Sequence, residues 1–203
     1  MHVLDSFLPT FVFTIFQYAL SAETTLPFKE QCLKWHNDFR SIHQVSEVVW
    51  NEDLAQDAED WARHLADNNL FDHATNLQQL QQGENLYWSS RRTTEPCTDA
   101  IKAFYKEIGD YDFDNPGFSD KTGHFTQVVW KATTKIGAAG KTRADGSFIV
   151  VVRYSPPGNL VNSFRENVLP SESWQPPTET GVVQTSSNFV FIITGLLFSS
   201  VFQ

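Results

Sequence analysis

Hydrophobic residues recur at helical spacing in the first half of the chain and at strand spacing in the second half. Three early segments place apolar residues three or four positions apart, which is typical of a helix with one buried face. The predicted helices run through 28–39, 54–66 and 97–108. Asn51 precedes the second segment and is a favourable N-cap, and Gly109 follows the third and is expected to end it.

Three extended segments follow these helices. Runs rich in β-branched and aromatic residues predict strands over 125–130, 135–140 and 147–154. The sequence Ala-Asp-Gly at 144–146 favours a tight hairpin turn between the last two. Because helices come first and strands cluster later, the order predicts an α+β domain with layered helices and antiparallel pairing.

A single histidine, His124, stands at the start of the predicted strand at 125–130. A buried histidine with a satisfied hydrogen bond is one interpretation of this position, and a metal ligand or an acid–base group is the other. The local sequence does not choose between them.

The amino-acid composition indicates a globular protein and argues against a nucleic-acid partner. Hydrophobic residues make up 41% of the 203 positions, which is ample for a packed core. The net charge is -9, from 15 basic and 24 acidic residues, and no basic stripe occurs. Nucleic-acid binding needs clustered cations, so we expect no nucleic-acid partner.

The N-terminus is typical of a secretory signal. Residues 7–20 are apolar, and Ala19 and Ser21 fit the small-x-small pattern of a cleavage site, although Lys and Arg are missing from the start. We expect 1–22 to be a signal peptide and 23–169 to form the folded domain.

The C-terminus is predicted to tether the protein. Residues 170–188 are rich in Pro, Ser and Thr and are expected to form a linker. Residues 189–203 are apolar and are expected to act as a lipid-anchor signal or a short membrane segment. The two ends together predict an extracellular protein that is secreted or anchored at the cell surface, with membrane association through the tail.

The chain has only two cysteines, Cys32 and Cys97. A secreted protein permits a disulfide between them, but the spacing alone does not show that their Cα atoms meet. A disulfide and two buried free thiols therefore both remain open.

Four motifs resemble the CAP superfamily, which comprises cysteine-rich secretory proteins, antigen 5 and pathogenesis-related 1 proteins. They are HNDFR at 36–40, GENLYW at 83–88, GHFTQVVWKAT at 123–133 and RYSPPGNL at 153–160. The motifs occur in the family's order and the resemblance covers roughly residues 27–169. It implies a three-layer α-β-α sandwich with helices on both faces of a small antiparallel sheet.

The resemblance also implies a central cleft lined by two histidines and two glutamates. The matching positions are His73, Glu84, Glu107 and His124. Imidazoles with nearby carboxylates suit a divalent metal such as Zn²⁺. Without the resemblance these are four ordinary polar residues, because their separations form no local metal motif.

An aromatic segment implies a lipid ligand. Tyr111, Phe113 and Phe118 have the aromatic spacing that in some family members forms a loop binding sterols. The alternative is that these rings anchor the turn at Asn-Pro-Gly to the core. We therefore expect a sterol or another lipid as one partner.

One departure from the family indicates the branch. Most secreted members carry a cysteine at the position of Val152. With its NPGF segment at 115–118 and its RENVLP ending at 165–170, the chain is similar to the cysteine-poor, Golgi-associated plant pathogenesis-related type. That type attaches to membranes through an N-terminal lipid, whereas His2 here replaces the glycine that myristoylation requires.

The sequence thus predicts a non-enzymatic binding protein for a lipid, a metal or a protein partner. An alternative is a hydrolase in which Ser89 or Ser90 is activated by His73, with Glu84 orienting the imidazole, although no Gly-x-Ser-x-Gly motif is present. A further alternative is a surface interaction protein, acting in gamete contact or host defence, with a vestigial cleft.

Overall fold

The structure, a computed structural model, describes residues 25–171. The predicted signal peptide, the tail and nearly all of the linker lie outside the described residues. Between 25 and 171, none of the helices combines the length and the apolar character needed to cross a membrane.

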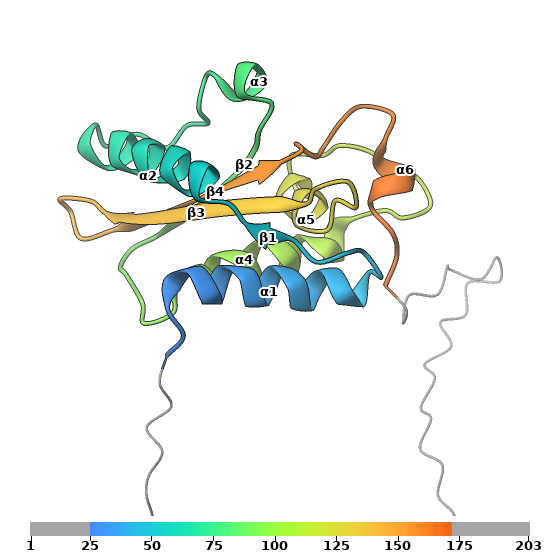
Figure 1. Ribbon diagram of the computed structural model, residues 1–203, viewed down its shortest axis with the longest axis horizontal. Coiled ribbons are helices and arrows are strands. Elements are labelled where there is room, and N and C mark those ends of the chain that lie inside the picture. The colour runs from blue at the N-terminus through green and yellow to red at the C-terminus, as the bar shows by residue number, and fades with distance from the viewer. Residues whose placement is uncertain (1–24, 172–203) are drawn as a thin grey trace, which may run out of the picture.

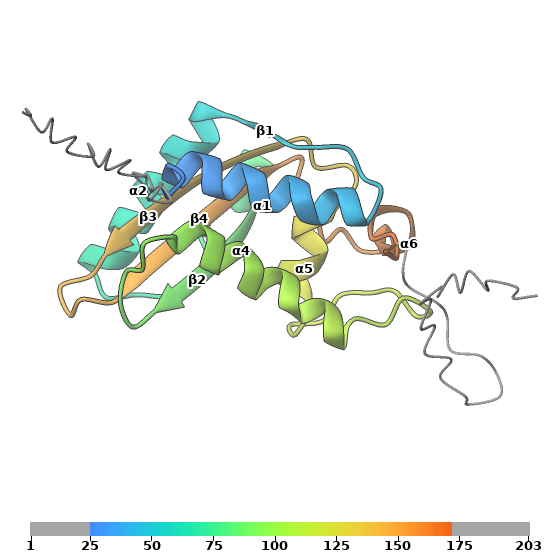
Figure 2. The ribbon, with the colours of Figure 1, turned by 90° about the horizontal axis from the view of Figure 1, so that it is seen from below.

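Helices cover both faces of a central sheet. Helix α2 (Glu52–Asp67) lies on one face, and helices α1 (Phe28–Ile42) and α4 (Pro96–Lys106) lie on the other (Figure 1). Seen from below, α1 and α4 run beside each other across the sheet, with helix α5 (Gly123–Val128) near one end (Figure 2). This arrangement confirms the predicted α+β fold and its three layers.

The sheet has four strands in the order β1-β3-β4-β2. They are β1 (Val49–Trp50), β2 (Gly83–Ser89), β3 (Lys135–Thr142) and β4 (Phe148–Ser155). The three long strands pair antiparallel, as predicted, but the short β1 pairs parallel to β3. A long part of the chain separates β1 from β3 and supplies the crossover that parallel pairing requires.

Three short helical segments complete the described chain. They are α3 (Leu77–Leu80), the 3-10 helix η1 (Glu107–Asp110) and α6 (Phe164–Asn167). Helix α4 passes directly into η1, which includes Gly109, so this glycine does not end the third helix as predicted.

The prediction of a strand over 125–130 was wrong, because most of this run lies in helix α5. Every residue of the run is buried, so its apolar pattern shows no helical period, and a short apolar run fits a strand or a buried helix equally well. The helix begins where Glu107 Oε2 accepts hydrogen bonds from the amides of His124 (3.0 Å) and Phe125 (3.1 Å). A distant carboxylate thus satisfies the first-turn N–H groups.

The predicted hairpin between β3 and β4 is confirmed. Gly146 has a φ of 86°, in the left-handed region, and its amide donates to Arg143 O at 3.0 Å. Arg143 N in turn donates to Ser147 O at 2.8 Å and closes the loop. Glycine is required because other residues adopt this φ at a steric cost.

Helix α2 begins at the predicted N-cap and lies very close to the sheet. The Asn51 side chain accepts a hydrogen bond from Leu54 N at 2.8 Å. At Gly137 of β3, a Cβ atom would lie 2.2 Å from Ala55 N. Only glycine allows the helix backbone to approach the strand this closely.

Two apolar clusters fill the space between the layers. The larger lies between the sheet and α1, α4 and α5, and the smaller lies between the sheet and α2. A disulfide between Cys32 and Cys97 joins α1 to α4 inside the larger cluster. Of the two states left open by the sequence, the structure therefore shows the disulfide.

Candidate functional site

A buried glutamate holds the first histidine. His73 Nδ1 donates to Glu84 Oε1 at 2.8 Å, and Ala74 N donates to the same oxygen at 3.1 Å. The Glu84 side chain is fully buried, whereas 58% of the His73 side chain is exposed. The imidazole is thus attached to the protein through Nδ1 while its other edge reaches solvent.

The second oxygen of Glu84 forms a buried ion pair. Glu84 Oε2 lies 2.9 Å from Arg153 Nε, although the angle between the two groups does not suit a hydrogen bond. Burial lowers the pKa of the Arg153 guanidinium, and the charges of Glu84 and Asp57 oppose that shift. Arg153 Nη1 also donates to Gln82 Oε1 at 3.0 Å. Glu84 is therefore committed to Arg153 and His73.

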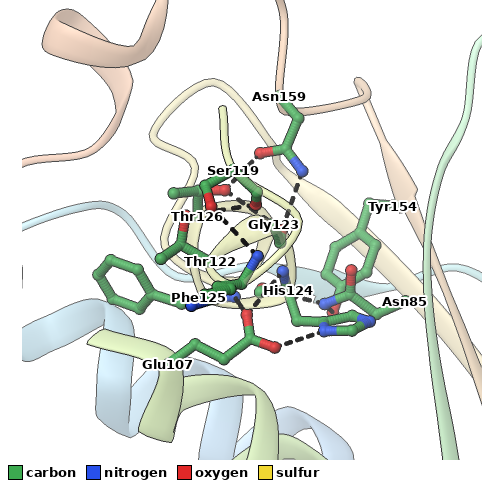
Figure 3. A network of polar contacts seen from close by, with 11 residues as sticks. Asn85, Glu107, Ser119, Thr122, Gly123, His124, Phe125, Thr126, Tyr154 and Asn159 are labelled. Atoms are coloured by element: carbon green, nitrogen blue, oxygen red, sulfur yellow. Dashed lines mark hydrogen bonds and ion pairs between the residues drawn. The ribbon is translucent and has the colours of Figure 1, made fainter. Parts of the chain in front are cut away.

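A second glutamate holds the second histidine. His124 Nδ1 donates to Glu107 Oε1 at 2.6 Å, while Glu107 Oε2 accepts the two amides at the start of α5 (Figure 3). The imidazole stacks on Phe104, with ring centroids 4.9 Å apart. One carboxylate thus fixes both the helix and the ring.

Three polar residues that sequence analysis did not select support this second pair. Asn85 Nδ2 donates to His124 O at 3.0 Å and to the Tyr154 hydroxyl at 3.2 Å (Figure 3). The third is His36, whose Nδ1 donates to Cys32 O at 2.7 Å, so its Nε2 is free to accept from the Tyr154 hydroxyl at 2.9 Å. All three lie in the quoted motifs, His36 in HNDFR, Asn85 in GENLYW and Tyr154 in RYSPPGNL, and this is the only signal that the sequence offers.

Burial keeps this supporting network neutral. It lowers the pKa of His36 to about 4, with Arg40 adding to the effect and the hydrogen bond to Cys32 opposing it. It also raises the pKa of the Tyr154 hydroxyl. The hydrogen bonds agree, because a neutral His36 has one donor and one acceptor nitrogen.

Both histidine–glutamate pairs meet the same part of β2. Glu84 contacts His73 directly, and its neighbour Asn85 bonds to the backbone of His124. Successive side chains of a strand point to opposite faces. The two pairs therefore approach the β2 edge from opposite sides of the sheet.

The donor atoms fit two metal ligands better than four. Each imidazole donates through Nδ1, which leaves Nε2 of His73 and of His124 with a lone pair. Among residues 25–171, no group of three or more His, Cys, Asp or Glu side chains is arranged to hold a metal ion. The predicted set of His73, Glu84, Glu107 and His124 thus stays a prediction, with the glutamates placed as partners of the histidines.

The structure separates the three aromatic residues expected to bind lipid. Tyr111 is 8% exposed, and its ring and that of Phe113 pack against Phe125, with centroids 5.5 and 6.2 Å away. Burial raises the pKa of Tyr111 to about 12. Phe118 is 59% exposed. The first two rings anchor the segment to the core, and only Phe118 is available at the surface.

Phe118 borders an open cavity of about 360 Å³. The cavity lies between the NPGF segment and the chain around α6, and Arg165 Nη2 bridges the two by donating to Asp114 O at 3.1 Å. Its lining residues are Asn115, Pro116, Gly117, Phe118, Val161, Asn162, Phe164 and Arg165. Its volume is at the lower end of the range for small-molecule sites.

The two serines of the hydrolase alternative lie far from the histidine. Ser89 lies at the opposite end of β2 from Glu84, which holds His73. In the sheet, Glu84 is opposite Arg153 and Ser89 is opposite Phe148. Five strand residues span roughly 17 Å. Ser89 Oγ instead donates to Arg91 O at 2.7 Å. The described residues therefore form no Ser–His–Glu constellation from these groups.

Fold and motifs together define a class of protein. The family model described as "Cysteine-rich secretory protein family" (CAP) matches residues 33–154. The chain belongs to this family, as the resemblance of its motifs predicted.

Individual relatives agree with this assignment. The Golgi-associated plant pathogenesis-related protein 1 of Homo sapiens is 40% identical over 145 residues, which are 70% of this chain and 93% of the human protein. Protein PRY2 of Saccharomyces cerevisiae is 33% identical over 147 residues, which are 70% of this chain but only 41% of the yeast protein. A crystal structure described as NaASP2 with Zn²⁺ has a TM-score of 0.57 at 21% identity, with 70% of this chain and 85% of that chain covered, and shows the same fold.

Proposed function

We propose that this CAP protein is a non-enzymatic binding protein whose histidine-flanked β2 edge binds a divalent metal ion such as Zn²⁺. The observation that carries the proposal is the matched pair of imidazoles, each held by a carboxylate through Nδ1. Metal-binding histidines commonly donate their second ring nitrogen to a carboxylate, which fixes the tautomer and raises the basicity of the metal-binding nitrogen.

The roles of the four residues differ in this proposal. His73 and His124 bind the ion through Nε2, and Glu84 and Glu107 orient the rings from behind. A bound ion with only two protein ligands keeps open positions, so it supplies a Lewis acid for an oxygen ligand of a partner. The Zn²⁺ in the description of NaASP2 is in accord with this metal.

Calorimetric titration with ZnCl₂ at pH 7.5 tests the proposal. We expect His73→Ala and His124→Ala each to weaken Zn²⁺ binding at least tenfold, whereas His64→Ala, at an exposed position of α2, should leave it unchanged. Binding should also weaken as the pH falls, because only neutral imidazole binds metal. A double variant of His73 and His124 that binds Zn²⁺ like the native chain would refute the proposal.

The cavity beside Phe118 supports a second candidate, the binding of a sterol or another lipid. Phe118, Val161 and Phe164 supply apolar surface, and the neighbouring Leu160 and Val161 are 51% and 78% exposed. Asn115, Asn162 and Arg165 also line the cavity, so its mixed apolar and polar lining suits a ligand that is mostly hydrophobic but carries a polar group, such as a sterol.

Titration with a fluorescent cholesterol analogue tests this candidate. Phe118→Ala should weaken binding at least fivefold, and Val49→Ala is a matched control because both residues are 59% exposed. Phe113→Ala should lower stability, since Phe113 packs against the core. Equal binding by the native chain and Phe118→Ala would exclude this cavity as the lipid site.

We further propose that the protein is extracellular and tethered by residues 189–203. The disulfide between Cys32 and Cys97 supports passage through an oxidising compartment. Deletion of 189–203 should move a tagged chain from the surface of secreting cells into the medium, and retention of the shortened chain at the surface would contradict the tethering.

A further inference from the structure

The connection between β2 and α4 contains Arg91 and Arg92, the only two adjacent basic residues in the 203-residue sequence. Both are exposed. Within residues 25–171 neither guanidinium belongs to an ion pair, and Arg92 lies over the Phe148 ring with its Cζ 5.4 Å from the ring centroid. A cation–π contact at an exposed site is weak. The fold therefore makes little use of this basic pair.

The backbone of this connection is open to another protein. Residues 90–94 are exposed, and none of them forms a hydrogen bond between backbone groups within the described chain. Ser89 Oγ donates to Arg91 O at 2.7 Å. Thr93 Oγ1 donates to Asp99 Oδ2 at 2.5 Å. Both bonds lie at exposed positions, so the segment can open without breaking the β2–β4 ladder or helix α4. Exposed loops are the preferred sites of proteolytic cleavage.

We propose that a serine endoprotease specific for paired basic residues cuts the bond between Arg92 and Thr93 as the chain passes through the secretory pathway. This inference rests on the proposed extracellular location, because the chain must enter that pathway. An acidic pocket gives a serine protease its preference for a basic side chain, and two such pockets bind Arg91 and Arg92. Water supplies a hydroxyl group to the carbonyl carbon of Arg92 and a proton to the nitrogen of Thr93. The cut therefore creates a new carboxylate and a new amino group.

The disulfide keeps the two resulting chains joined. Cys32 precedes the cut and Cys97 follows it, and both are 0% exposed. The first chain contains α1 and β2, and the second contains α4, β3 and β4. Strand β2 stays paired with β4 along its whole length, and α1 stays packed with α4 in the larger apolar cluster. The product is thus a two-chain protein with the fold intact.

The cut also divides the candidate metal site. His73 and Glu84 belong to the first chain, whereas Glu107 and His124 belong to the second. Each histidine keeps its own glutamate, because neither pair spans the cut. The buried ion pair of Glu84 with Arg153 then links one chain to the other. In the two-chain protein the site lies between two polypeptides, while its hydrogen bonds remain those of the uncut chain.

Digestion of the purified full chain tests the cleavage site. A kexin-type protease, which cuts after paired basic residues, should give one band on a gel without reductant and two bands with reductant, and sequencing of the new N-terminus should begin at Thr93. Arg92→Gln should slow the cleavage at least about 100-fold, because the acidic pocket is left without its charged partner. Lys121→Gln, which removes an exposed single basic residue from another loop, should change nothing.

A second variant keeps the basic pair and changes only the bond. Thr93→Pro should block cleavage with both arginines present, because proline fixes the backbone and removes the N–H after the cut bond. A full chain that resists the protease under conditions that cut a peptide of residues 87–97 would overturn the proposal. Cleavage of Arg92→Gln at the native rate, or two bands without reductant, would do the same.

Expression in eukaryotic cells that contain such a protease tests whether the cut is made there. A foreign signal peptide before the full chain makes entry into the pathway independent of residues 1–22. We expect the exported chain to be cut at Arg92 and the Arg92→Gln variant to remain whole. Export of the native chain in one piece would overturn the proposal. Failure of residues 1–22 to direct export without the foreign signal would contradict only the proposed location.

Discussion

Replacing Glu84 with glutamine removes the negative charge from the buried ion pair with Arg153. The two side chains are 0% and 3% exposed, so water replaces little of the lost interaction. Removing one partner of a buried pair costs about 3–5 kcal/mol, because the other charge stays buried without compensation. Arg153 keeps its hydrogen bond to Gln82, so we expect the lower end, about 3 kcal/mol. This is a large fraction of the stability of a typical domain.

Urea unfolding at pH 7.5 with the disulfide intact measures this loss. With a typical dependence on urea, the midpoint should fall by about 1.5 M. Glu59→Gln is the matched control, because Glu59 Oε1 lies 2.8 Å from Lys141 Nζ but both side chains are about one-third exposed. That pair should contribute less than about 1 kcal/mol. If both substitutions cost the same, the reasoning from burial is refuted.

Three further substitutions test the supporting structure. Burial lowers the pKa of His36 from about 6.5 in the unfolded chain to about 4 in the folded protein, so the unfolded state binds a proton first as the pH falls. The free energy of unfolding should therefore fall by about 3 kcal/mol between pH 6.5 and 4. His36→Gln should flatten this dependence on pH, and an unchanged slope would contradict burial of a neutral imidazole. Asn51→Ala should cost about 1 kcal/mol in urea unfolding through loss of the α2 N-cap, and no loss would exclude a stabilising cap. Gly137→Ala should lower the free energy of unfolding by about 3 kcal/mol, because the new Cβ meets the backbone at Ala55, and native stability would show that α2 can shift freely.

Local patterns predicted helix α2 and the hairpin of β3 and β4. Helix α2 has a polar outer face and an N-cap, and β3 and β4 are joined by a turn that requires glycine, so each carried its own signal. Helix α5 had no such local signal in the sequence, because the core surrounds it and its first amides bond to Glu107, a residue from another element. Strand β2 was recognised as a motif without being predicted as a strand.

The candidate site shows the same division. The family resemblance pointed to His73, Glu84, Glu107 and His124. It did not show that each histidine is held by one glutamate, or that Glu84 is paired with Arg153. His36 and Tyr154 were not selected, since nothing local distinguishes a buried polar network from ordinary polar residues.

The sequence by itself determined the family and the layered α+β fold, because these follow from motif order and local periodicity. Tertiary structure alone decided the Cys32–Cys97 disulfide and the packing of Tyr111 and Phe113 against the core. The physical reason is distance along the chain: hydrogen bonds and packing between remote segments leave no period in the sequence of either segment.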